Sequence, residues 1–170
     1  MKRSRRRSLE AEIDAVRAVS AAYGQSVILE KQVLQHVWRY RQLGFLSREA
    51  GGQLFGGLGA DGLIVTEATG PYPGDERGRT HYRSDPRAAQ FAIDERSARN
   101  LLYLGEWHTH PEDEPRMSGD DASAIRALHE RSRLNLREAL LRIVGRSAPP
   151  IGLSLWSVAE DGVSPWQFER

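Results

Sequence analysis

The feature that most constrains the fold is an apolar run that stops at a proline. Residues 101–104 have the composition of a buried strand, and His108 and His110 follow shortly before Pro111. Side chains two residues apart in a strand lie on the same face, so the two imidazoles point the same way. Proline has no amide hydrogen and fixes its own φ. We therefore expect the strand to end at Pro111 with both histidines at its end.

A polar motif follows after a loop that contains proline. Ser118 and Asp121 open a helical pattern, with Asp121 in its first turn. Two imidazole nitrogens and one carboxylate oxygen leave a fourth tetrahedral position for water, which is typical of a catalytic zinc site. Taken alone, the histidine pair also fits a surface or core pair, and Ser-x-x-Asp also fits a helix-capping box. In combination they predict one Zn²⁺ per chain, bound by His108, His110 and Asp121.

The spacing of these residues carries a family resemblance. Ten residues separate His110 from Asp121, and six separate Pro111 from Ser118. The arrangement resembles the JAMM motif of JAB/MPN metallopeptidases. That resemblance implies that the metal site is catalytic and that the Ser118 hydroxyl stabilises the oxyanion of the reaction. The same hydroxyl can also cap the helix that carries Asp121.

A second part of the resemblance lies earlier in the chain. In JAB/MPN proteins a catalytic glutamate opens a Glu-x-x-Gly-x-Leu-x-Gly stretch, which Glu49, Gly52, Leu54 and Gly56 match here. The resemblance therefore implies that Glu49 is the general base. Glu106 is the alternative from the residues themselves, because it shares the strand face of both histidines. It comes two residues earlier, farther down the strand, so we prefer Glu49.

The remaining sequence predicts one globular domain. Its 170 residues suffice for a single well-buried core. We expect a basic tail and a short helix over residues 1–25, with residues 1–8 as a solvated basic tail and a helix over 9–22, and a JAB/MPN-like domain over 26–170. The net charge is +1, there are no cysteines, and no apolar run reaches the roughly 20 residues of a membrane span. We expect a cytoplasmic protein with neither a membrane nor a nucleic-acid partner.

Alternating helix and strand patterns predict an α/β (α+β) fold, and the resemblance implies a curved, mostly antiparallel mixed sheet flanked by helices. Trp107 and Thr109 face away from the histidines and should pack into the sheet. Further predictions are a strand over 26–30, a helix over about 33–44, a hairpin over 49–65, a mobile loop over 70–80, a helix after Asp85-Pro86, and strands over 138–144 and 151–158.

The resemblance also implies a function. This chain has the full motif and so resembles the JAB/MPN isopeptidases, which remove ubiquitin or ubiquitin-like proteins from their targets. The sequence of residues 103–111 is most similar to the corresponding sequence of bacterial JAB peptidases encoded beside E1- and E2-like proteins. These include deconjugating enzymes of CBASS antiphage operons, which act on conjugates of a cGAS-like nucleotidyltransferase. The expected partner is a ubiquitin-like protein or a conjugated protein substrate, such as a cGAS-like nucleotidyltransferase with its E1- and E2-like proteins.

Two other readings stay open from the residues alone. Barrel metallohydrolases also use a His-x-His at a strand end, but only 60 residues follow His110 here, too few to complete a barrel of about 250 residues. A non-catalytic scaffold or binding module with a structural metal is the second alternative.

Overall fold

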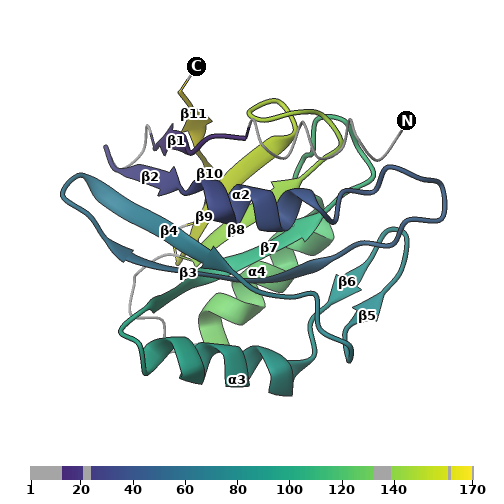
Figure 1. Cartoon of the computed structure of the whole chain (residues 1–170), viewed down its shortest axis with the longest axis horizontal. Helices are drawn as coiled ribbons and strands as arrows, with labels where there is room; N and C mark the ends of the chain where they lie inside the picture. The colour runs from purple at the N-terminus through teal and green to yellow at the C-terminus, as the bar shows by residue number, and fades with distance from the viewer. Residues whose placement is uncertain (1–12, 21–23, 132–138, 161, 170) are drawn as a thin grey trace.

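One mixed sheet organises the chain (Figure 1). The computed structural model describes residues 13–20, 24–131, 139–160 and 162–169. In these residues the strands are β1 (Val16–Val19), β2 (Ser26–Leu29), β3 (Gly51–Leu58), β4 (Gly62–Ala68), β5 (Glu76–Arg77), β6 (Tyr82–Arg83), β7 (Leu102–Thr109), β8 (Ala139–Val144), β9 (Leu153–Ala159), β10 (Gly162–Pro165) and β11 (Gln167–Phe168). The helices are α2 (Lys31–Trp38), α3 (Pro86–Ser97) and α4 (Gly119–Arg131).

The sheet has the strand order β10-β9-β8-β7-β3-β4-β2-β1-β11, and β5 pairs with β6 in a separate hairpin. Within the large sheet, β2 runs parallel to β4 and β7 parallel to β8, while the other neighbouring pairs are antiparallel. The predicted mixed, mostly antiparallel sheet with flanking helices is confirmed. No helix in the described part of the chain is both long enough and apolar enough to span a membrane.

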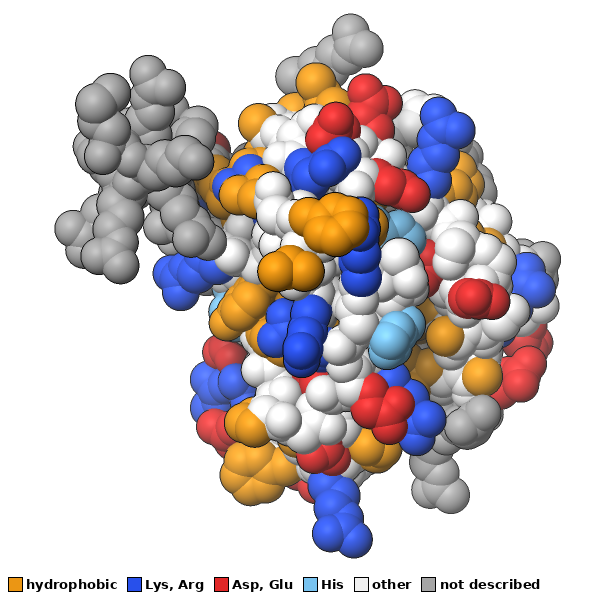
Figure 2. Space-filling model, turned by 90° about the vertical axis from the view of Figure 1, so that its right-hand side faces the viewer, with side chains coloured by type: hydrophobic (Ala, Val, Ile, Leu, Met, Phe, Trp, Pro, Cys, Tyr) orange, Lys and Arg blue, Asp and Glu red, His pale blue; other side chains and the backbone are white. Residues whose placement is uncertain are grey.

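Several segments meet at one edge of the molecule. The end of β7, the loop after α2 and the β5-β6 hairpin all lie on the right-hand side of Figure 1. Figure 2 shows this side, where histidine side chains surface among acidic and basic ones. The end of β7 and the segment that leads into β3 therefore lie on the same side of the molecule.

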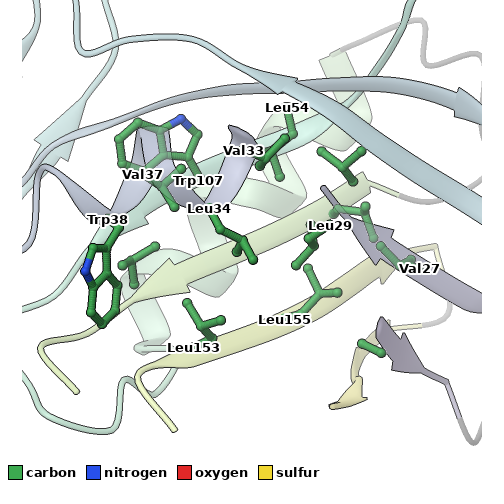
Figure 3. Packing of buried hydrophobic residues seen from close by; sticks show 14 of the residues in the cluster. Val27, Leu29, Val33, Leu34, Val37, Trp38, Leu54, Trp107, Leu153 and Leu155 are labelled. Carbon is green, nitrogen blue, oxygen red and sulfur yellow. The ribbon is translucent and has the colours of Figure 1, made fainter. Parts of the chain in front are cut away.

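Helix α2 covers one face of the sheet with an apolar stripe. Val33, Leu34, Val37 and Trp38 are all buried, and they pack with strand residues such as Trp107 (Figure 3). These four positions recur at helical spacing, which is why this segment folds as an amphipathic helix on the sheet. Trp107 is fully buried, as is Thr109, so the prediction that both face into the sheet is confirmed.

Helices α3 and α4 lie on the other side of the sheet from α2 (Figure 1). Ile125 of α4 packs with Leu141, Ile143 and Val158 in a second apolar cluster. Helix α3 begins at Pro86, and the side chain of Asp85 accepts hydrogen bonds from the first backbone amides of the helix. This is the predicted start, because a capping carboxylate satisfies amides that have no partner within the helix.

The N-terminal prediction was wrong where the structure can test it. Residues 16–19 form strand β1, which pairs with β2 and β11, and they do not form a helix. The apolar residues of this segment fit helical spacing, but backbone pairing between two neighbouring strands satisfies its amides and carbonyls instead. A boundary after residue 25 would separate β1 from its partner β2. The predicted basic tail, residues 1–8, lies outside the described residues.

Three other predictions need correction. Helix α2 ends at Trp38, well before residue 44, and Leu43 beyond it is 57% exposed. Strand β9 begins at Leu153, two residues later than predicted, and Ile151 before it is 62% exposed. The loop over 70–80 contains β5 and is fastened by side chains: the carboxylate of Asp75 accepts hydrogen bonds from the amide of Tyr72 and the hydroxyl of Tyr82.

Candidate metal and catalytic site

The structure brings the three predicted metal ligands together. His108 Nε2 lies 3.0 Å from His110 Nε2 and 3.1 Å from Asp121 Oδ1, and His110 Nε2 lies 3.3 Å from Asp121 Oδ2. The histidines come from the end of β7 and Asp121 from the first turn of α4. Their side chains are 11–15% exposed. Three donor atoms on two regular elements thus converge at the molecular surface.

This donor set fits Zn²⁺. Zinc lies about 2.0–2.2 Å from imidazole nitrogen and carboxylate oxygen, so two of its ligands are no more than about 4.4 Å apart. The three separations above are all shorter. In the described residues, this is the one group of three or more His, Cys, Asp or Glu side chains close enough to share an ion.

Ser118 and Asp121 form a reciprocal cap at the start of α4. The Asp121 amide donates to the Ser118 hydroxyl (3.1 Å), and the Ser118 amide donates to Asp121 Oδ2 (2.7 Å). Burial raises the pKa of Asp121, but hydrogen bonds from His108, His110 and Ser118 outweigh burial and hold the pKa well below its usual range. The carboxylate is therefore ionised and held in place, as a metal ligand must be.

Glu49 is a buried carboxyl beside this group. It is 5% exposed and precedes β3, whose Gly51 is paired with His108 across the sheet. Burial raises the pKa of Glu49 to about 7, with His110 lowering it and the negative charges of Asp121 and Glu112 raising it. The pKa of Glu49 thus depends on the charges of His110, Asp121 and Glu112, yet Glu49 is not one of the three clustered residues. A carboxyl with a pKa near 7 is suited to accept and return a proton at neutral pH.

The backbone around Glu49 is fixed from two sides. The Glu49 amide donates to the carbonyl of Gly78 (2.7 Å), and its carbonyl accepts from Arg77 Nε (2.6 Å). The next residue, Ala50, donates its amide to the hydroxyl of Thr109 (3.0 Å). Thr109 stands between the two histidines, so the segment that carries Glu49 is tied to the strand that carries the ligands.

Glu106, the alternative base, is bound into a different network. Its carboxylate accepts hydrogen bonds from Gln53 Nε2 and from the Tyr103 hydroxyl, the latter at 2.6 Å. Burial raises the pKa of Glu106 to about 7, and the hydrogen bonds from Tyr103 and Gln53 lower it. The structure therefore does not join Glu106 to the histidine and aspartate group.

Sequence reasoning missed the polar supports of the site. We expected Thr109 only to pack into the sheet, but its hydroxyl bonds both Ala50 and the amide oxygen of Gln42. Gln42, in the loop after α2, drew no attention because a single glutamine in a loop carries no pattern. Glu112 lies near His110, with Nδ1 and Oε2 3.9 Å apart. The position of polar Thr109 between the two histidines was the only feature of the sequence that could have indicated these supporting contacts.

Comparison with known proteins decides the family. A model of the family described as prokaryotic homologs of the JAB domain matches residues 29–160, which include Glu49 and the three clustered residues. The chain belongs to the prokaryotic JAB family. The matched region of this JAB domain covers most of the large sheet and all three described helices.

Curated proteins are similar in sequence to much of this chain. A Vibrio cholerae protein named CD-NTase/cGAS isopeptidase is 39% identical over 125 residues, which are 71% of this chain and 76% of that protein. A Pseudomonas aeruginosa protein of the same name is 39% identical over 103 residues, 59% of this chain and 65% of that protein. A solution structure of a Desulfitobacterium hafniense protein has a similar fold, with a TM-score of 0.59 and 21% identity, covering 81% of this chain and 87% of that one.

Proposed function

We propose that this JAB protein is a zinc-dependent isopeptidase that hydrolyses the bond between the C-terminal tail of a ubiquitin-like protein and its target. The observation that carries the proposal is the cluster of His108, His110 and Asp121 with donor atoms 3.0–3.3 Å apart, beside a buried carboxyl that is not part of it. A structural site for zinc is usually closed by four protein ligands, whereas three leave a position for chemistry. The relatives named isopeptidases support the class of reaction.

The roles of the residues follow from their chemistry. His108, His110 and Asp121 hold the ion, and bound Zn²⁺ supplies the Lewis acidity that activates water and polarises the scissile carbonyl. Glu49, in its ionised form, accepts a proton from water and, once protonated, donates it to the leaving amine. The Ser118 hydroxyl donates a hydrogen bond to the oxyanion that develops on the carbonyl.

The names of the relatives also suggest the target. Both are called CD-NTase/cGAS isopeptidases, so we propose a conjugate of a cGAS-like nucleotidyltransferase as the substrate. E1- and E2-like proteins would form that conjugate, and the setting would be antiphage defence of the CBASS type.

Two variants test the reaction. Zinc per chain is measured by elemental analysis, and turnover is measured on a nucleotidyltransferase conjugate made by a bacterial E1- and E2-like pair. Wild type should hold about one zinc and cleave the conjugate. Glu49→Gln should keep the zinc and lose about 10²–10⁴-fold in rate, whereas His108→Ala should lose both. Equal cleavage by Glu49→Gln and wild type would overturn the assignment of Glu49, and a zinc-replete wild type that cleaves no such conjugate would favour a scaffold.

A further inference from the structure

An exposed apolar and basic surface borders the candidate site. Leu43, Phe45 and Leu46, in the loop after α2, are 57%, 75% and 88% exposed. The guanidinium of Arg79 lies over the ring of Phe45, 4.0 Å from its centroid. We call residues 39–48 together with residues 77–83 the basic shelf. Three large apolar side chains exposed within four residues are typical of a contact surface, because isolated chains rarely expose apolar side chains in a group.

The charge of the basic shelf is one-sided. Residues 39–48 contain three arginines and residues 77–83 contain three more, and neither segment contains Asp or Glu. One of the six, Arg83, pairs with Glu76 just outside the second segment (4.0 Å). The whole chain, in contrast, is nearly balanced at +1. Figure 2 shows basic and hydrophobic side chains side by side on the face where histidines surface. A partner that fits this surface has apolar side chains and a negative charge.

The basic shelf is attached directly to the site. Gln42, 2% exposed, donates from Nε2 to the carbonyls of Ser47 (3.2 Å) and Arg79 (2.8 Å), and so joins the two segments. Its amide oxygen accepts from the hydroxyl of Thr109, between the two histidines. The Glu49 amide is bonded to Gly78. A protein bound to the basic shelf would therefore have a fixed position relative to Glu49 and the two histidines.

An acidic segment next to the site argues against nucleic acid as the occupant. Residues 112–114 are Glu-Asp-Glu, and all three are exposed. Glu112 lies beside His110, with Oε2 and Nδ1 3.9 Å apart. Phosphates would be repelled there, whereas a protein surface can carry acidic groups for the basic shelf and basic groups for residues 112–114.

We propose that the basic shelf binds the folded body of the protein substrate, through an acidic surface of that substrate that carries exposed apolar side chains. This inference rests on the proposed isopeptidase function. It assigns substrate affinity to a surface outside the groups that carry out the reaction. A substrate reduced to the residues around the scissile bond would not use this surface.

The test compares two substrates and two double variants. The substrates are the nucleotidyltransferase conjugate and a short peptide that spans the same scissile bond. The variant Phe45→Ser with Arg79→Glu disrupts the basic shelf. The matched control, Phe91→Ser with Arg87→Glu, changes an exposed phenylalanine (70%) and an exposed arginine on α3. Melting temperature and zinc content should stay at wild-type values in both variants, because the altered side chains lie outside the core.

The shelf variant should raise KM for the conjugate about tenfold at unchanged kcat, since the loss of one anchoring side chain has an effect of this size at interfaces. Its cleavage of the peptide should match wild type, and the control should match wild type on both substrates. A higher salt concentration screens charges, so it should raise the KM of the wild type for the conjugate more than it raises the KM of the shelf variant.

Three results would overturn the proposal. The first is a shelf variant that cleaves the conjugate like wild type or loses as much on the peptide. The second is a wild-type dimer that the shelf variant converts to a monomer with unchanged KM, which would assign the surface to a second copy. The third is binding of a short single-stranded DNA that only the shelf variant loses. A wild type that cleaves neither substrate would instead reject the isopeptidase function itself.

Discussion

The hydroxyl of Thr109 accepts a hydrogen bond from the amide of Ala50, at 3.0 Å, in the interior of the protein. Thr109 stands between the two clustered histidines, and Ala50 follows Glu49. The Thr109 amide also donates to the Ala50 carbonyl (2.8 Å). The start of β3 lies beside the end of β7, and the Thr109–Ala50 pair joins them there. This pair therefore sets the position of Glu49, the proposed base, relative to the two histidines.

Replacing Thr109 by valine keeps the shape of the side chain but removes this contact. The Ala50 amide would be left without a partner in the interior, which costs about 1–3 kcal/mol. We expect turnover to fall by about 10²-fold as Glu49 shifts, with zinc content unchanged. Thr109→Ser, which retains the hydroxyl, is the control and should keep most activity. A Thr109→Val enzyme with wild-type turnover would show that the pair does not position Glu49.

Ser118 has two proposed roles that a substitution can separate. Ser118→Ala removes the hydroxyl that caps α4, which should lower the free energy of unfolding by about 1 kcal/mol. Loss of an oxyanion donor should also lower kcat by about 10²–10³-fold. Zinc should remain, because the backbone amide of Ser118 still donates to Asp121. If kcat falls less than about twofold, while the loss of stability is as expected, Ser118 is a helix cap only.

The sequence predicted the cluster of His108, His110 and Asp121 better than it predicted the surroundings of that cluster. His108 and His110 could be paired from strand alternation alone, and Asp121 from its place in a helical first turn, because these rules are local. Glu49 came only from family resemblance. Its place beside His110 depends on the pairing of β3 with β7, between residues more than fifty positions apart in the sequence, and no periodic pattern encodes such a pairing.

The misses have the same physical origin. Residues 16–19 fit helical spacing, yet they form β1 because β2 and β11 offer hydrogen-bond partners on both sides. Gln42 joins two loops through backbone carbonyls, and such contacts leave no mark on composition or spacing. The start of α3 was predictable, because the cap and the proline that define it are neighbours in the sequence.

An ion-pair group fastens α3 to the sheet, and its effect should depend on pH. Glu67 of β4 accepts hydrogen bonds from Arg99 (2.9 Å) and Arg96 (3.2 Å). The hydrogen bond from Arg99, with the charges of both arginines, lowers the pKa of Glu67 despite partial burial. Since the folded pKa is below the unfolded value of about 4.3, this group stabilises the fold above that pH and loses its effect as pH falls through the folded pKa.

We therefore expect Glu67→Gln to have a lower melting temperature than wild type at pH 7, with the difference disappearing in acid. Thermal unfolding followed between pH 7 and pH 3 measures this. Glu95→Gln removes the same charge from a carboxylate that pairs with Arg96 of the same helix, and should have a smaller effect. A difference for Glu67→Gln that grows toward low pH would contradict the assignment.

Arg142 has a different environment, because its charge is buried and has no hydrogen-bond partner in the described part of the chain. The side chain is fully buried in β8, and none of its three guanidinium nitrogens has a hydrogen-bond partner among the described residues. The ring of Phe168 lies near the guanidinium, with its centroid 5.5 Å from the guanidinium carbon. Burial lowers the pKa of Arg142 to about 9.

Replacing Arg142 by methionine should stabilise the protein, because an apolar side chain of similar length needs no hydrogen bonds in the core. The expected gain at pH 7 is about 1–3 kcal/mol in the free energy of unfolding, measured with urea. Between the folded pKa and the unfolded one the unfolded wild type binds more protons, so wild-type stability rises with pH and the gain should shrink above about pH 9. Arg142→Lys retains a buried charge and should gain nothing. A destabilised Arg142→Met variant would mean that the guanidinium makes stabilising contacts stronger than the one with Phe168.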